Sequence, residues 1–343
     1  MPPDKEEDIS DISWSAESIR YGLTWIGWEM LRRESILEDL AAVFGDKDAD
    51  LIAALALFKL EGHDALSTFE DRVPQVWLPS VAPASSEQIA ELVDRLDDAK
   101  FNAYYARRSQ RAHDRAQNRA HQRAHQGTLE KAAAWVFDCT GSAAYGESRW
   151  TALESTARKH FLLACDRATG DVLYADVFDD VGSMEDRLSL FDARMKHAGL
   201  APLEAVVVAD GIDDPKQSEQ LERQRRIIEG GFERLAQDVG DAEGAAAGRL
   251  LTTGAGWRGK LFVFSIAEAL RLSTLKKLQM AGVGEQDLPL SDVLAQKLFM
   301  QLRGLQAHLH RSTSVYMAAV LGEKFRRLAQ LLGIGKLPQR LER

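Results

Sequence analysis

The chain has 343 residues, 45% of them hydrophobic, which is enough for one large domain or for about two or three smaller ones. No apolar run reaches the roughly 18 residues of a membrane-spanning helix, and the acidic N-terminus has no signal-peptide character, so we expect no membrane partner. Two cysteines are too few for a disulfide framework, and a reducing cytoplasm fits. The net charge of -9 argues against a general nucleic-acid binder, but charge is unevenly spread, so local charge matters more than the sum.

Residues 1–100 are predicted to form a helical N-terminal region. Apolar residues recur at helical spacing through residues 16–72, and no strand pattern interrupts them. The first of these residues are Ile19, Leu23, Ile26 and Met30. After a proline-containing loop, Ser85 with Gln88 three residues later predicts the start of another helix.

Residues 101–130 are predicted to form an arginine-rich helix or linker. Arginine recurs at every fourth position, which keeps the side chains on one slowly turning side of a helix. The residues of this stripe are Arg107, Arg111, Arg115, Arg119 and Arg123. Two interpretations stay open: a solvated linker helix, as most charge runs are, or an arm that contacts DNA phosphates and releases their counterions.

Residues 131–240 change to a pattern of strands and helices. A short β-prone run, Trp135–Asp138, ends in an acid, and a lone carboxylate beside a core strand is costly unless it is paired or holds a metal. The run 160–165 is apolar on both faces, as a central strand should be, and turn residues 166–171 join it to a strand over 172–178. We expect these three strands to lie antiparallel.

A helix and a fourth strand follow. Ser183 begins the helix with a capping pattern, and Gly199 ends it. The apolar run 203–209 is a predicted buried strand and is followed at once by Asp210. A right-handed crossover returns this strand parallel to the first. Asp210 is therefore expected beside Asp138 at one edge of the sheet.

A third acid, Glu229, lies on the next predicted helix, one turn after Arg225. It borders the apolar face of that helix, which could pack on the sheet and aim the carboxylate at the two aspartates. Three carboxylates supply the oxygen ligands that Mg²⁺ prefers, and two such ions can activate water and stabilise the leaving oxygen of a phosphodiester. We therefore predict a metal site, for Mg²⁺ or Mn²⁺, made by Asp138, Asp210 and Glu229.

The remaining residues, 241–343, are predicted to form a C-terminal helical region packed on the α/β core. Apolar periodicity predicts helices over 261–278, 288–309 and 316–332.

These acids and their neighbours resemble bacterial insertion-sequence transposases that carry an Asp-Asp-Glu triad on a ribonuclease-H-like core. The likeness is strongest to the group whose third acid lies in a Tyr-x2-Arg-x3-Glu-x6-Lys signature. Asp138 and Asp210 match the first two acids, and Arg225 and Glu229 match the Arg and Glu of the signature.

The sequence departs from this group at three points. The Tyr and Lys positions of the signature hold Glu222 and Ala236. The group usually carries a long, mainly β insertion between its second and third acids, whereas here the gap is 229 − 210 = 19 residues. The insertion is therefore essentially missing from this chain.

The resemblance implies an α/β fold, a ribonuclease-H-like mixed sheet flanked by helical N- and C-terminal regions. It implies Mg²⁺- or Mn²⁺-dependent DNA cleavage and strand transfer at insertion-sequence ends. The implied partner is double-stranded DNA, both the terminal inverted repeats and the target, contacted by the N-terminal helices, by Arg225 and by the arginine stripe. It also implies a homodimer and a location in the bacterial cytoplasm, at the nucleoid.

Two alternatives remain open. The first is a non-catalytic remnant of a transposase that still binds DNA, which the missing insertion favours. The second, weaker one is an actin-like nucleotide-binding ATPase or kinase, because Asp138–Gly141 and Asp210–Gly211 faintly resemble its phosphate loops. A catalytic Cys139/His160 pair has no identifiable third group to orient it, so buried structural cysteines are expected instead.

Overall fold

The structure, a computed structural model, describes most of the N-terminal half of the chain and separate segments of the rest. The described residues are 14–61, 66–79, 84–123, 133–138, 159–166, 169–179, 183–200, 204–207, 254–280, 292–310, 315–318, 323–334, 338 and 340–341.

The described part of the N-terminal region begins with a strand and continues as helices. The elements are β1 (Trp14–Arg20), α1 (Gly22–Arg33), α2 (Ile36–Phe44) and α3 (Asp46–Glu61). The prediction that residues 16–72 are helical throughout is therefore wrong at its start. Ile19 lies in β1 and pairs with Ala307, far along the chain, so its apparent helical spacing to Leu23 is coincidental.

Short helices lead from this region to a long one. They are η2 (Leu66–Thr68), α4 (Phe69–Arg72), η3 (Val73–Gln75), α5 (Ser86–Arg95) and α6 (Asp98–Arg123). Ser85 and Gln88 each accept a hydrogen bond from the other's backbone N–H, so the predicted start of α5 is confirmed. The arginine repeat is also helical as predicted, because α6 runs unbroken over it.

Within the described residues, the central sheet has four strands and the predicted pairing. Its parts are β2 (Ala133–Asp138), β3 (Lys159–Asp166), β4 (Val172–Asp179), α8 (Met184–His197) and β5 (Glu204–Val207). The strand order is β4-β3-β2-β5, with β3 antiparallel to both neighbours and β5 parallel to β2. The capping box at Ser183 and the left-handed Gly199 bound α8 as predicted.

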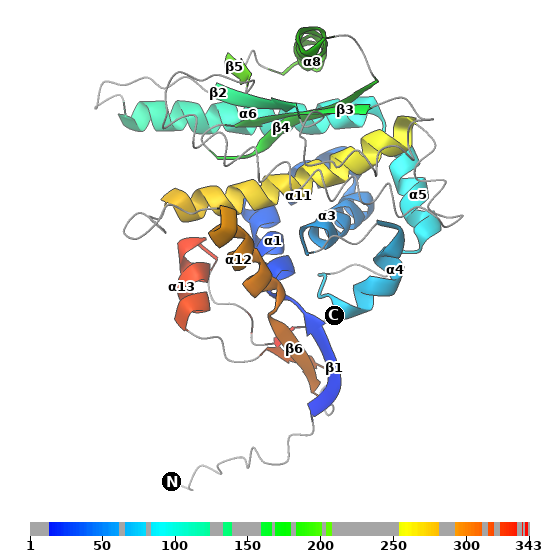
Figure 1. The fold of residues 1–343 in the computed structure, drawn as a ribbon, viewed down its shortest axis with the longest axis vertical. Coiled ribbons are helices and arrows are strands. Elements are labelled where there is room, and N and C mark those ends of the chain that lie inside the picture. The colour runs from blue at the N-terminus through cyan, green and yellow to red at the C-terminus, as the bar shows by residue number, and fades with distance from the viewer. Residues whose placement is uncertain are drawn as a thin grey trace, which may run out of the picture.

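A long buried helix, α11 (Gly254–Met280), supports this sheet and confirms the helix predicted over 261–278. Its residues 259–276 are buried on every side, and they include charged residues such as Lys260, Glu268 and Arg271 as well as apolar ones. Figure 1 shows α11 (yellow) crossing the molecule between the sheet and the N-terminal helices α1 and α3. At Gly259 a Cβ would lie 2.7 Å from Val93 Cγ1, so glycine allows α11 to approach α5 closely.

The C-terminal region is only partly helical. It contains α12 (Asp292–Arg303), β6 (Gln306–His310), β7 (Val315–Ala318), α13 (Glu323–Leu331) and β8 (Arg340–Leu341). The helices predicted over 288–309 and 316–332 are therefore wrong where β6 and β7 lie. Gln306–His310 alternates polar and apolar residues with the period of a strand, and β1 joins it in a second sheet of order β1-β6-β7-β8.

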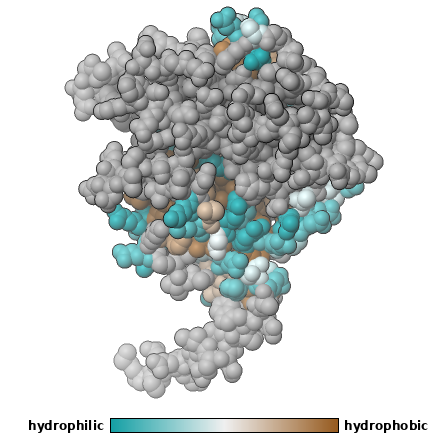
Figure 2. Space-filling view, in the orientation of Figure 1, coloured by the Kyte–Doolittle hydropathy of each residue, from teal (hydrophilic) through white to brown (hydrophobic). Residues whose placement is uncertain are grey.

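One main hydrophobic core joins these parts. It contains residues from α1 at one end of the chain, from β3 and β4, from α11, and from Leu332 and Ile334 near the C-terminus. A smaller cluster, which includes Tyr21 and Trp77, lies against the second sheet. The face in Figure 2 carries mostly hydrophilic side chains on its described residues, with hydrophobic ones visible between them. In the described part of the chain, no helix is both long and apolar enough to cross a membrane.

Candidate functional site

Asp138 is the last residue of β2, in the central sheet. It pairs in register with Leu162 of β3, which is in turn opposite Asp176 of β4. On its other side, β5 runs parallel to β2, and the described register ends where Val136 meets Val207, three residues before Asp210. Asp138 thus occupies the strand end that the sequence predicted for it.

The other predicted site residues lie outside the described part of the chain. These are Asp210, Arg225 and Glu229. Their convergence with Asp138 therefore stays a prediction. Among the described residues alone, no group of three or more His, Cys, Asp or Glu side chains could hold a metal. The predicted donor set consists only of carboxylates, and that chemistry fits a hard divalent cation such as Mg²⁺.

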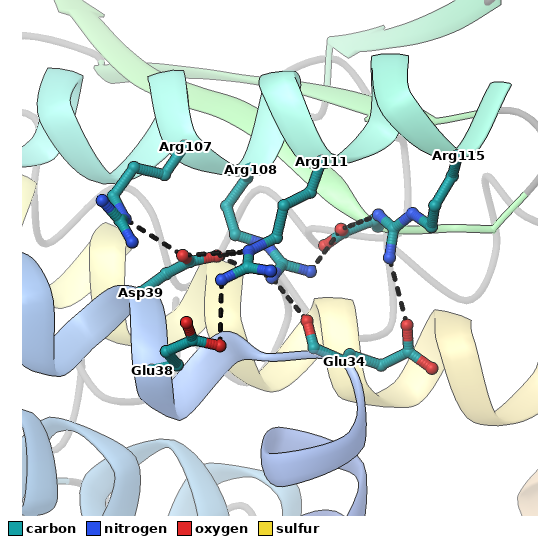
Figure 3. A network of polar contacts seen from close by, with 8 residues as sticks. Glu34, Glu38, Asp39, Arg107, Arg108, Arg111 and Arg115 are labelled. Atoms are coloured by element: carbon teal, nitrogen blue, oxygen red, sulfur yellow. Dashed lines mark hydrogen bonds and ion pairs between the residues drawn. The ribbon is translucent and has the colours of Figure 1, made fainter. Parts of the chain in front are cut away.

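The arginine stripe on α6 turns toward the rest of the molecule over its first half (Figure 3). Arg107 Nε donates to Asp39 Oδ1 at 3.0 Å, and Arg111 Nε donates to Asp39 Oδ2 at 2.8 Å. Arg115 donates to Glu34 Oε2 at 3.2 Å and to Asp171 Oδ2 at 2.8 Å. These three arginines therefore bind carboxylates of their own chain.

Arg108, which is not part of the stripe, lies at the centre of this group and is fully buried. Its guanidinium donates to the Glu34 carbonyl at 2.7 Å, to Asp39 Oδ2 at 3.1 Å, and to the Asp171 carboxylate. Burial alone lowers the pKa of Arg108, but the nearby carboxylates of Asp171 and Asp39 outweigh it and raise that pKa above its ordinary value. Arg108 therefore stays charged inside the protein.

We call these residues the arginine cluster: Arg107, Arg108, Arg111 and Arg115 with Glu34, Glu38, Asp39 and Asp171. Lys277 of α11 joins it through Glu34 Oε1 at 2.8 Å. Glu38 and Asp39 belong to α2, and Glu34 lies in the two-residue connection between α1 and α2. Asp171 lies in the turn between β3 and β4. The cluster therefore ties the N-terminal helices, α6, α11 and the central sheet together, and its arginine charges are largely balanced within the chain.

Sequence reasoning missed Arg108 and Asp39. A signal existed for Asp39, because it shares the buried face of α2 with Ile36 and Leu40 at helical spacing. A carboxylate on an apolar helix face needs a partner. The partner could not be identified locally, because Asp39 and Arg108 are 69 residues apart in the chain.

The stripe extends to Arg119 and Arg123, which lie within α6 but whose side chains are outside the described part of the structure. The two interpretations, a solvated linker and a DNA-contacting arm, must therefore be judged separately for the two halves of α6. Its first half is docked on the molecule through one buried face rather than being a solvated linker, while the interpretation of Arg119 and Arg123 as phosphate contacts stays a prediction.

Cys165 is buried within β3, as expected of a structural cysteine. Burial raises the pKa of its thiol well above the ordinary value, and the nearby carboxylates of Asp171 and Glu268 raise it further. The thiol is thus neutral and a poor nucleophile.

Comparison with known proteins adds no assignment. No family model, no curated protein and no solved structure matches this chain. The resemblance to insertion-sequence transposases therefore rests on Asp138, Asp210, Arg225 and Glu229 and on their spacing in the sequence.

Proposed function

We propose that this chain is an insertion-sequence transposase by ancestry, with a ribonuclease-H-like core that cleaves and joins DNA. The observation that supports this most is the pairing of β2 with β5. The two strands are parallel neighbours, Asp138 ends one of them, and Asp210 follows the other by three residues. Because the carboxyl ends of parallel strands reach the same edge of a sheet, both aspartates are expected at that edge.

Asp138, Asp210 and Glu229 would hold Mg²⁺ or Mn²⁺ there. When bound, the metal supplies positive charge that activates water and stabilises the leaving oxygen at a phosphodiester. Arg225, one helical turn before Glu229, would add a positive charge beside the phosphate. No protein nucleophile is needed for this reaction.

The proposed partner is double-stranded DNA, first the terminal inverted repeats and then the target. The N-terminal helical region and the end of α6 at Arg119 and Arg123 would contact the DNA outside the cut site. Arg107, Arg111 and Arg115 are less suited to this role, because their guanidinium groups already bind Asp39, Glu34 and Asp171 (Figure 3). The proposed place of action is the bacterial nucleoid, with the chain acting as a homodimer.

The test is nicking of a supercoiled plasmid that carries the inverted repeats flanking the gene. Wild-type protein should nick it with Mg²⁺, and Asp138→Asn should abolish nicking without weakening a gel shift on the same DNA. Asp192→Asn is the matched control, since Asp192 is an exposed acid of α8 whose only ion pair among the described residues is with Lys196. Nicking by the Asp138→Asn protein at the wild-type rate would contradict the assignment.

A non-catalytic, DNA-binding remnant is the second candidate. The 19-residue gap between Asp210 and Glu229 and the alanine at position 236 favour it, since both replace parts that the resembled enzymes carry. A gel shift on the inverted repeats with no Mg²⁺-dependent nicking by the wild-type protein would assign this second function.

A further inference from the structure

A cavity of about 470 Å³ lies where α6, β4, α8 and α11 meet. Its volume is in the range of small-molecule sites, roughly 300–1,000 Å³. It is separate from the arginine cluster, which lies further along α6, and nothing in the proposed reaction uses it.

The floor of this cavity is aromatic and fixed by packing. Phe101 and Phe262 have ring centroids 4.7 Å apart, and Tyr105 packs 5.3 Å from Tyr174. All four side chains are buried, and the Tyr105 hydroxyl is satisfied by Ser265 Oγ at 2.9 Å. An apolar ligand body could therefore enter without rearranging the floor.

The rim offers hydrogen-bond donors. Arg194 Nη1 donates to Asp176 Oδ2 at 2.7 Å, and Arg258 pairs with Asp98. A guanidinium has five N–H donors, and each of these arginines spends one on its carboxylate. Among the described residues neither has another hydrogen-bond acceptor, and both side chains are about one-third exposed, 35% and 32%. Both guanidinium groups therefore keep N–H donors that can bind an anion beside the carboxylates of Asp98 and Asp176.

The cavity also lies close to the proposed catalytic edge. Asp176 on its rim, Leu162 and Asp138 form one cross-strand row of the sheet. Neighbouring strands are about 4.8 Å apart, so the two aspartate positions are separated by roughly 10 Å across β3.

We propose that this cavity binds one nucleotide unit, with the phosphate on Arg258 and Arg194 and the base on the aromatic floor. A nucleotide combines the two groups that the cavity could contact. Its phosphate has acceptors for the arginine donors of the rim, and its base is a planar, largely apolar body for the aromatic floor. Its source is either a free mononucleotide or the end of a DNA strand. The strand-end source rests on the proposed function, whereas binding of a free nucleotide does not.

The test is calorimetric titration of the full-length protein with dAMP, deoxyadenosine and inorganic phosphate. We expect dAMP to bind at least tenfold more tightly than either part alone. Arg258→Gln should weaken dAMP binding tenfold or more, and Asp98→Asn should leave it unchanged or strengthen it, because the competing carboxylate is gone. General damage to the fold would weaken both variants. Arg326→Gln, an exposed arginine of α13, is the matched control.

Equal binding of dAMP by wild type and Arg258→Gln, no saturable binding by wild type, or weaker binding in Asp98→Asn would overturn the proposal. A 5′-phosphorylated single-stranded oligonucleotide that displaces dAMP assigns the site to strand ends, and one that does not displace it assigns the site to free nucleotides. Mg²⁺-dependent nicking is measured in a separate experiment. If the protein does not nick DNA, the dAMP titration still tests whether the cavity binds a nucleotide.

Discussion

Arg108 is the residue on which the arginine cluster depends most. It is fully buried and touches Asp39, Asp171 and the Glu34 carbonyl, so it connects three segments that are far apart in the chain. A buried ion pair adds little net stability compared with an apolar pair, but removing one partner leaves the other charge buried and uncompensated. The surrounding carboxylates make Arg108 hard to replace.

We therefore predict that Arg108→Met lowers the free energy of unfolding by about 3–5 kcal/mol, measured by urea denaturation. Arg326→Met, at an exposed position of α13, should change it by less than about 0.5 kcal/mol. A loss below about 1 kcal/mol in Arg108→Met would show that the carboxylates do not depend on this arginine.

Tyr21 provides a pH-dependent contribution to stability. Burial raises its pKa to about 12, whereas a tyrosine in the unfolded chain titrates near 10. Between these pH values the unfolded chain has lost a proton that the folded chain keeps. Stability therefore falls as the pH rises from about 10 to about 12, by at most about 1.4 kcal/mol per pH unit for this group.

Tyr21→Phe should flatten that fall when urea denaturation is repeated at several pH values. At pH 7 it should cost nothing, because the Tyr21 hydroxyl has no hydrogen-bond partner among the described residues. Tyr316→Phe is the contrast: its hydroxyl donates to Glu17 Oε1 at 2.6 Å, and its loss should cost about 1 kcal/mol at pH 7. An unchanged high-pH slope in Tyr21→Phe would contradict the assignment to this residue.

At the scale of elements, α6 illustrates what a sequence repeat can and cannot predict. The four-residue spacing predicted a helix with arginines on one side, and that helix exists. The same spacing could not indicate that Arg107, Arg111 and Arg115 meet carboxylates, because Asp39, Glu34 and Asp171 come from distant parts of the chain. A charged stripe in a sequence thus predicts one face of a helix. Which groups that face contacts depends on the tertiary structure and cannot be predicted from the spacing.

If α6 contacts DNA, the two halves of the stripe should behave differently. Arg119→Gln and Arg123→Gln should each reduce the slope of log binding constant against log salt concentration by about 1, as expected for one lost phosphate contact. Arg107→Gln should leave that slope unchanged, because Arg107 binds Asp39. Gel shifts at several salt concentrations measure this. An equal reduction in all three variants would mean that the whole stripe faces DNA.

Strands were harder to predict in the flanking regions than in the core. The central sheet could be predicted because β2, β3 and β4 follow one another and a capped helix leads to β5. β1 and β6 pair across nearly the whole chain, and only β6 is marked locally, by its two-residue alternation. The helical spacing of the apolar residues before Gln306 predicts a helix that continues over this strand.

At the scale of the whole molecule, the flanking regions share one core with the central sheet. α11 packs on β4 from one side and on α3 from the other (Figure 1). The sequence predicted which strand end carries Asp138, but neither the arginine cluster nor the cavity at α8, because both are made by side chains from four or more separate segments. Contacts of that kind depend on how elements pack, which periodicity does not encode.

The central claim is that three acids distant in sequence form one divalent-metal site. Electron paramagnetic resonance of Mn²⁺, whose free-ion signal is lost on binding, measures this directly. Wild-type protein should bind Mn²⁺, and Asp138→Asn, Asp210→Asn and Glu229→Gln should each weaken binding at least tenfold, while Asp192→Asn should not. Wild-type affinity in any one of the three would show that its carboxylate is not a ligand and would contradict the proposed site.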